Sequence, residues 1–301
     1  MESAGAAAIP LAVGDQSRPE RSFWRGLVRL ARRKPLGALA VVVIGVVVVA
    51  ALFAPRLAPY DPLVTNPVQR LQLPSLKHPL GTDNLGRDVL SRIIHGARVS
   101  LWVGFLATMI GTGCGAAIGI GSGYVGGKAD LVVQRFVDAL QTIPGLILAL
   151  VLISVFGPSV TNAIVAIAIV IAPSDSRVLR SATLATKVHP YVEAAQVVGC
   201  RTGRIIVRHI VPNVVAPMLI LASIRFAQAI LIEASLSFLG LGAPPPQPSW
   251  GNMLSGSGRQ YMEQVPTLAL FPGMAIALTT LAFNLLGDTL RDIFDPRLRG
   301  T

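Results

Sequence analysis

Long apolar stretches alternate with short polar segments along most of the chain. Each stretch has roughly the 20 residues that a helix needs to cross the hydrocarbon core of a bilayer. Charged residues make up 14% of the sequence and hydrophobic residues 52%, whereas a soluble domain usually carries about a quarter charged residues. The pattern predicts an all-α membrane protein with six transmembrane helices, at about residues 36–55, 99–121, 136–156, 163–185, 214–239 and 267–290.

The first apolar stretch, residues 36–55, is open to two interpretations. A cleaved signal peptide would carry a shorter basic region and an apolar run of about 7–15 residues. Here the basic segment Arg25–Lys34 precedes uninterrupted apolar sequence from Leu36 to Ala54. We favour a retained first span that follows a cytoplasmic tail, residues 1–35.

Residues 56–98 form a hydrophilic connection that we place on the extracytoplasmic side. Its second half, Leu85 to Arg98, carries apolar residues at helical spacing. This spacing predicts an amphipathic helix that lies at the membrane surface before the second span begins.

Two prolines affect the spans that follow. Residues 124–135 are predicted to form a short polar turn, after which the third span contains Pro144. The fourth span is interrupted at Pro173, where we expect the helix to kink and then continue.

Glycines recur every fourth residue in the second span, which places them on one helical face. Such small-residue stripes let neighbouring helix backbones approach closely. The segment Gly121–Gly126 also fits the G-x-G-x-x-G pattern of nucleotide-binding loops, but it follows a span rather than the strand of a βαβ unit. We therefore assign helix packing to Gly111, Gly115, Gly119 and Gly123.

Lysine and arginine give the chain a formal net charge of +11. With a cytoplasmic N-terminus, 18 of the 26 basic residues fall on inside segments and 7 on outside segments. This bias follows the positive-inside rule, so the charge calls for no nucleic acid partner. The loop 186–212 and the tail 291–301 are then also cytoplasmic.

Motifs for catalysis or metal binding are missing from the sequence. It has no zinc-binding spacing, no serine-hydrolase motif and no P-loop of the form G-x-x-x-x-G-K-[ST]. The four histidines are scattered, and Cys114 and Cys200 suggest neither a disulfide framework nor a metal site. We predict no catalytic residue, no metal and no bound cofactor, so that any ATP driving this protein is hydrolysed by another chain.

Polar side chains inside spans are costly, so each is a candidate for lining a transport pathway. Arg225 and Glu233 lie eight residues apart, about 80° off a common helical face, and could pair loosely or line one cavity. The alternative is that they satisfy neighbouring helices and that Asp138 is interfacial. Both interpretations stay open for the whole set, which comprises Asp138, Gln141, Arg225, Glu233 and Asn284.

The loop before the fifth span is predicted to form two short helices joined at Gly199. Pro190 suits a first helical position, and Glu193 falls in the first turn, where a carboxylate interacts favourably with the helix dipole. Ala194 and Ala195 are small enough to let a partner surface come close. A positive-inside loop explains the arginines that follow, but it does not explain Glu-Ala-Ala and Gly at this spacing.

These loop residues resemble the cytoplasmic signature of ABC importer permeases, which is Glu-Ala-Ala, three residues, Gly, nine residues and Ile-x-Leu-Pro. The match runs from Glu193 to Pro212, and His209 and Val211 depart from the general pattern. Further segments resemble the second membrane subunit (C-type) of the dipeptide/oligopeptide branch, namely His78–Asp88, Glu233–Gly242, Pro248–Met253 and Asn284–Asp288.

The resemblance implies a type I importer fold and a machine of several chains. This chain would pair with a homologous permease as a heterodimer, and the pair would work with two cytoplasmic ATPase domains and an extracytoplasmic substrate-binding protein in a lipid membrane. Residues 99–290 would form the permease core, and Pro190–Arg204 would contact the ATPase, where ATP and Mg act. The residues implied in this coupling are Glu193, Ala194, Ala195, Gly199, Arg201 and Pro212.

The resemblance further implies import of dipeptides or oligopeptides across the bacterial cytoplasmic membrane. Haem, nickel complexes and other small solutes are alternatives. A secondary transporter that works without ATP is a hypothesis of a different class, but such folds usually show internal repeats and this sequence shows none. A membrane-embedded enzyme lacks a catalytic constellation.

Overall fold

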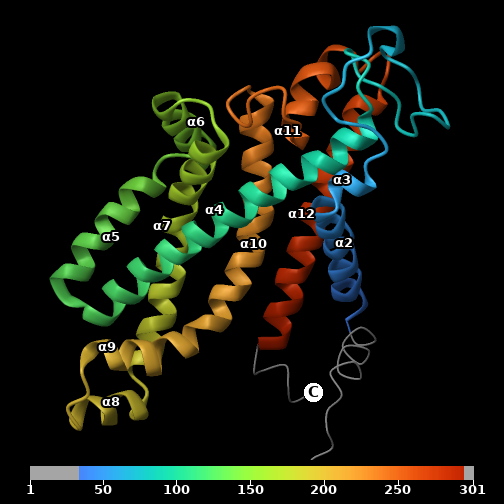
Figure 1. The fold of residues 1–301 in the computed structure, drawn as a ribbon. Helices are drawn as coiled ribbons and strands as arrows, with labels where there is room; N and C mark the ends of the chain where they lie inside the picture. The colour runs from blue at the N-terminus through green and yellow to red at the C-terminus, as the bar shows by residue number, and fades with distance from the viewer. Residues whose placement is uncertain (1–33, 295–301) are drawn as a thin grey trace, which may run out of the picture.

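The computed structural model describes residues 34–294, and every regular element in that range is helical. The tails predicted for residues 1–35 and 291–301 lie mostly outside it. The elements, labelled in Figure 1, are α2 (Pro35–Leu52), α3 (Ala54–Leu57), η1 (Pro67–Gln69), α4 (Val89–Val125), α5 (Gly127–Gln141), α6 (Gly145–Phe156), α7 (Val160–Lys187), α8 (Pro190–Val197), α9 (Thr202–Ile205), η2 (Ile206–Ile210), α10 (Val211–Phe238), α11 (Trp250–Met253), η3 (Leu254–Gly258) and α12 (Thr267–Phe294).

Five helical segments in the described part of the chain are long and apolar enough to cross a membrane, and α5 with α6 makes a sixth if that bent pair is counted as one span. The five contain α2, α4, α7, α10 and α12. The chain is therefore an all-helical, multi-span membrane protein, as the apolar pattern predicted.

The separate surface helix predicted before the second span is wrong. Residues Val89 to Val125 form the single helix α4, which Asp88 caps by accepting a hydrogen bond from the Ser91 backbone N–H at 2.8 Å. No proline occurs in α4 to break the helix where the pattern changes from amphipathic to apolar. Val89 is buried against Met253 and Leu268, so it packs on protein rather than on lipid.

The third span is also not the single helix that was predicted. The polar turn expected before it belongs to α5, and the axes of α5 and α6 differ by 88°. Pro144 stands between them with an extended backbone (φ −53°, ψ 130°), which ends helical geometry at this position. Pro173, by contrast, lies inside α7, which continues unbroken to Lys187.

The glycine stripe of α4 lies against α7, and these two helices make the most extensive contact in the fold. A Cβ atom on Gly115 would lie 2.8 Å from the carbonyl oxygen of Ala172 and 2.9 Å from the Cβ of Asp175. Figure 1 shows α4 running obliquely across α7 and α10. The two backbones can approach this closely because the stripe carries no side chains.

Two apolar clusters hold the long helices together. One, which we call the loop cluster, contains Leu179 of α7, Val192 and Ala195 of α8, Ile205 of α9 and Val214 of α10. The other, which we call the upper cluster, joins α4, α6, α7 and α10 and contains Val103, Ile153, Ile167, Ala229 and Leu236.

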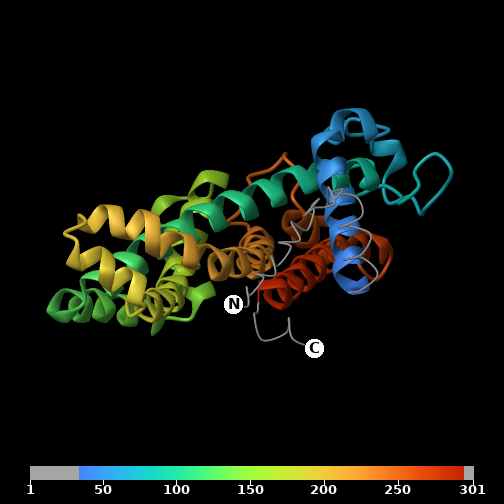
Figure 2. The same ribbon diagram turned by 90° about the horizontal axis from the view of Figure 1, so that it is seen from below.

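The start of α2 and the end of α12 lie side by side, because Lys34 Nζ is 2.5 Å from Asp292 Oδ2. Both lie toward the same end of the bundle as α8 and α9 (Figure 1). Seen from below, α8 and α9 occupy one side of the molecule and α2 and α12 the other (Figure 2). The segment between α3 and α4 projects from the opposite end of the bundle.

Candidate functional site: the α8 loop and the buried charges

The helix α8 begins and ends where the sequence predicted. Pro190 occupies its first turn after the N-cap residue His189. Gly199 has a φ of +78°, a left-handed conformation that favours glycine, and its N–H donates to the Gln196 carbonyl at 3.0 Å. The chain then reverses into α9, so the loop consists of two short helices joined at Gly199.

One face of α8 is anchored and the other is exposed. Val192 and Ala195 are buried in the loop cluster, whereas Glu193 and Ala194 are exposed. The prediction that Ala195 faces a partner is therefore wrong, because residues three apart share a helical face and Ala195 follows Val192 inward. Ala194 remains on the outer surface beside Glu193.

Two apolar residues lie on the exposed side of the loop. The side chains of Val197 and Val198 are 87% and 76% exposed. Sequence reasoning missed both valines, although two adjacent apolar residues just before a glycine turn were a usable signal. Arg201, at the N-cap of α9, and Pro212, in the first turn of α10, are also exposed.

Aromatic rings join the start of α8 to η2. The Tyr191 ring lies 5.5 Å from the His189 ring in a stacked arrangement and 6.1 Å from the His209 ring. Because His209 lies in the π-helix η2, this contact connects α8 to the residues directly before α10.

Arg225 and Glu233 do not pair with each other, which contradicts that part of the prediction. Arg225 Nε donates to Asp175 Oδ1 at 2.6 Å, and its Nη1 donates to Gln228 Oε1 at 2.7 Å. Asp175, on α7, is completely buried and also accepts from Thr112 Oγ1 at 2.7 Å. Sequence reasoning placed the interruption of the fourth span at Pro173 and missed Asp175, two residues later, as an ion-pair partner.

Glu233 lies instead in a cluster of hydroxyl groups at the opposite end of the bundle from α8. Its carboxylate accepts hydrogen bonds from Ser100 Oγ at 3.1 Å and Ser237 Oγ at 2.7 Å. The Trp250 backbone N–H donates to Ser100 Oγ at 3.4 Å, and its indole N–H donates to the Ile93 carbonyl at 3.0 Å. Glu233 thus ties α10 and α4 to α11.

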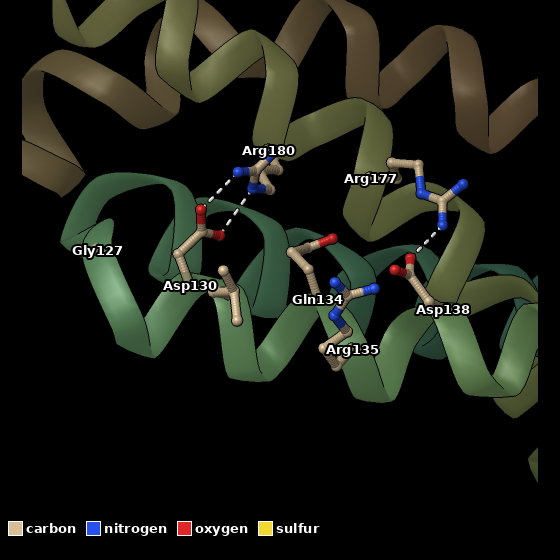
Figure 3. A pocket seen from close by; sticks show the side chains of 8 residues that line it. Gly127, Asp130, Gln134, Arg135, Asp138, Arg177 and Arg180 are labelled. Carbon is tan, nitrogen blue, oxygen red and sulfur yellow. Dashed lines mark hydrogen bonds and ion pairs between the residues drawn. The ribbon is translucent and has the colours of Figure 1, made fainter.

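The remaining polar candidates lie in different places. Asp138 is part of α5 and forms an exposed ion pair with Arg177 of α7. Beside it, Arg180 binds both oxygens of Asp130 at 2.7 and 2.5 Å, and the two pairs line a cavity of about 440 Å³ between α5 and α7 (Figure 3).

Gln141 and Asn284 belong to neither cluster. Within the described residues, the Gln141 amide nitrogen is buried without a hydrogen-bond partner, and Asn284 is exposed on α12. No group of three or more histidine, cysteine, aspartate or glutamate side chains is placed to hold a metal ion in this part of the chain. The five candidates therefore do not form one site.

This geometry defines a class of protein. Its members are all-helical membrane domains with an exposed helical loop that is anchored on its inner face. Residues 115–300 match the family described as binding-protein-dependent transport system inner membrane component, and residues 22–74 match the N-terminal TM domain of oligopeptide transport permease C. The chain belongs to this family of transport components and is a permease subunit of an ABC importer.

Curated relatives match along nearly the whole chain. It is 41% identical to the dipeptide transport system permease protein DppC of Alkalihalophilus pseudofirmus, over 92% of this chain and 91% of the relative. It is also 41% identical to the glutathione transport system permease protein GsiD of Pectobacterium atrosepticum, over 93% of this chain and 92% of the relative.

A solved structure supports the fold. An inward-facing structure of the MetNI methionine ABC transporter matches with a TM-score of 0.55 and 19% identity, covering 68% of this chain and 97% of that one. At this identity the likeness concerns the arrangement of helices alone.

Proposed function

We propose that this chain is one of two homologous permease subunits in an ATP-driven importer of dipeptides and oligopeptides in the bacterial cytoplasmic membrane. Its termini and the α8 loop face the cytoplasm, ATP and Mg act on two separate ATPase domains, and a binding protein delivers the peptide from outside. The named activities of the two relatives support the peptide class, since glutathione is itself a small peptide. The missing P-loop supports ATP hydrolysis elsewhere.

The observation that carries the coupling role is the two-sided construction of α8. Its inner face, with Val192 and Ala195, is fixed to α7, α9 and α10 through the loop cluster. Its outer face presents Glu193, Val197 and Val198. The two exposed valines beside Glu193 favour contact with a partner protein, and the ATPase subunit would push on this outer face and move the anchored helices.

A second cavity suits a peptide cargo with varied side chains. It measures about 610 Å³, lies between α6, α10 and α12, and is largely apolar, with hydroxyl groups from Ser235 and Thr280. Apolar walls with a few polar groups are typical of small-molecule sites. ATP would drive import through its different affinities for the inward-open and outward-open states.

The docking role of the α8 loop is testable with paired valine substitutions. The double variant Val197→Asp/Val198→Asp puts two carboxylates on the outer face, where they would be desolvated on docking. We expect roughly a tenfold or greater loss of the ATPase subunits that co-purify with the permease pair, since each buried unpaired charge costs well over 1.4 kcal/mol.

The matched control is Val68→Asp, because Val68 is 90% exposed but lies in η1, at the opposite end of the bundle from α8. It should leave co-purification of the ATPase unchanged. Normal ATPase binding by the loop variant would show that α8 is not the docking surface.

A further inference from the structure

Asp175 and Arg225 lie near the middle of α7 and α10, the two long helices that the α8 loop connects. Both oxygens of Asp175 are used, one by Arg225 of α10 at 2.6 Å and one by Thr112 of α4 at 2.7 Å. Gln228 holds the far side of the guanidinium at 2.7 Å. We call this set of four residues the α7–α10 joint. It is a charged contact of three helices.

The joint lies between the two apolar clusters. Leu179 of α7 and Val214 of α10 belong to the loop cluster, whereas Ile167 of α7 and Ala229 of α10 belong to the upper cluster. Asp175 and Arg225 lie between these positions in both helices. Any movement of the loop cluster must therefore be transmitted past Asp175 and Arg225 before it reaches the upper halves of α7 and α10.

Next to the joint, α7 contains a proline that makes the helix easier to bend. Pro173, two residues before Asp175, lies inside the helix and has no backbone N–H to donate. The helix can bend more easily here than elsewhere along its length. On the α4 side, Gly115 allows close approach to Asp175. The turn of α7 that bends most easily is thus joined to two other helices through the completely buried carboxylate of Asp175.

We propose that the α7–α10 joint makes α7 and α10 move as one unit, so that displacement of the α8 loop reaches the upper half of α10, which lines the 610 Å³ cavity. Apolar side chains can slide past one another with little change in contact. The ion pair resists separation, because the completely buried carboxylate of Asp175 would be left without its cation. Asp175 and Arg225 are positioning residues in this account, and they need not touch the cargo.

The inference rests on the proposed function, so its test uses the whole transporter with its ATPase subunits and binding protein. Spin labels at Val165 of α7 and Leu219 of α10, both exposed and on opposite sides of the joint along their helices, report the distance across it after Cys114 and Cys200 are replaced by alanine. We expect this distance to be the same with and without a non-hydrolysable ATP analogue. In Asp175→Ala it should change with nucleotide and broaden.

Transport gives the second readout, normalised to the amount of assembled complex. Asp175→Ala should lower ATP-dependent uptake roughly tenfold while basal ATPase activity stays within about twofold, the range expected when coupling between distant sites is lost. The paired variant Asp175→Asn/Arg225→Gln replaces the charges by amides that can still bond to each other. It should recover most of the uptake. If Asp175→Ala does not assemble, Asp175→Asn is measured in its place.

Arg177→Ala is the control. Arg177 also lies on α7, and its ion pair with Asp138 is exposed at both side chains. This variant should behave as wild type. The proposed role of the joint would be overturned if the distance in Asp175→Ala did not change with nucleotide. It would also be overturned if Arg177→Ala and Asp175→Ala had equal effects. A wild-type complex that takes up solute without ATP would instead overturn the proposed function, which keeps the two failures apart.

Discussion

At the scale of single residues, polar groups in the spans connect neighbouring helices through hydrogen bonds and ion pairs. Glu233 illustrates this, because its buried carboxylate accepts from Ser100 and Ser237, and Ser100 in turn accepts from the backbone of Trp250. The acid thereby positions the segment after α10. Each oxygen of this buried carboxylate accepts a hydrogen bond from a serine hydroxyl, so removing the acid leaves both hydroxyl groups without that partner.

Replacing Glu233 should therefore destabilise the protein in a graded way. Glu233→Ala removes the acceptor for two buried hydroxyl groups, and each group left unpaired costs roughly 1–3 kcal/mol. Glu233→Gln keeps one acceptor oxygen and should cost less. Thermal unfolding in detergent measures the difference, with Ser235→Ala as a control whose hydroxyl is bonded only locally, to the Leu231 carbonyl. Equal midpoints for the alanine and glutamine variants would contradict this role.

The residue-level predictions from sequence succeeded where the signal was local. Gly199 and Pro190 mark a turn and a helix start through their own backbone preferences, and both lie where that chemistry requires. Arg225 and Asp175 are 50 residues apart, and their pairing depends on how α7 and α10 pack. Hydropathy identifies a charge in a span, but it carries no information about its partner.

At the scale of elements, the contact between α4 and α7 explains why one helix carries so many glycines. Gly111, Gly115, Gly119 and Gly123 face α7, whereas Gly113 and Gly121 of the same helix have nothing within 4 Å of an added Cβ atom. Gly113 and Gly121 therefore do not take part in close packing between helices. This division gives matched pairs of substitutions on a single helix.

Gly119→Ala and Gly121→Ala should have opposite effects on stability. A Cβ atom on Gly119 would lie 2.9 Å from the Arg180 backbone nitrogen and even closer to the Ser176 carbonyl oxygen, so the helices must separate. Such overpacking costs about 1–3 kcal/mol. Gly121→Ala should be neutral or gain up to about 1 kcal/mol of helix propensity. Thermal unfolding of the two variants checks this, and equal destabilisation would refute the packing role.

The two element-level errors have a common cause. Hydropathy marks which residues are apolar, but it does not show where a helix axis begins or bends. The helix α4 extends past the predicted start of the second span because no residue there breaks its hydrogen bonds. The third span divides at Pro144, even though its apolar composition continues through α6. A proline inside α7 has no such effect, so proline alone does not predict a break.

At the scale of the whole molecule, the exposed apolar surface indicates which surroundings the chain requires. In α2, 17% of the residues are buried, and Val42 and Val46 are more than half exposed. On α5 the exposed side chains include Leu131 and Phe136, while the charged Asp130 is buried toward α7. Exposed apolar side chains on long helices are what lipid or another membrane subunit would cover.

We propose that this chain imports peptides with ATP hydrolysed by its partners. The most direct measurement is uptake of a labelled dipeptide into proteoliposomes that contain both permeases, the ATPase subunits and the binding protein. The account predicts that uptake requires ATP and the binding protein, is competed by other dipeptides and persists when ion gradients are collapsed. Uptake that proceeds without ATP and stops when the gradients collapse would contradict it.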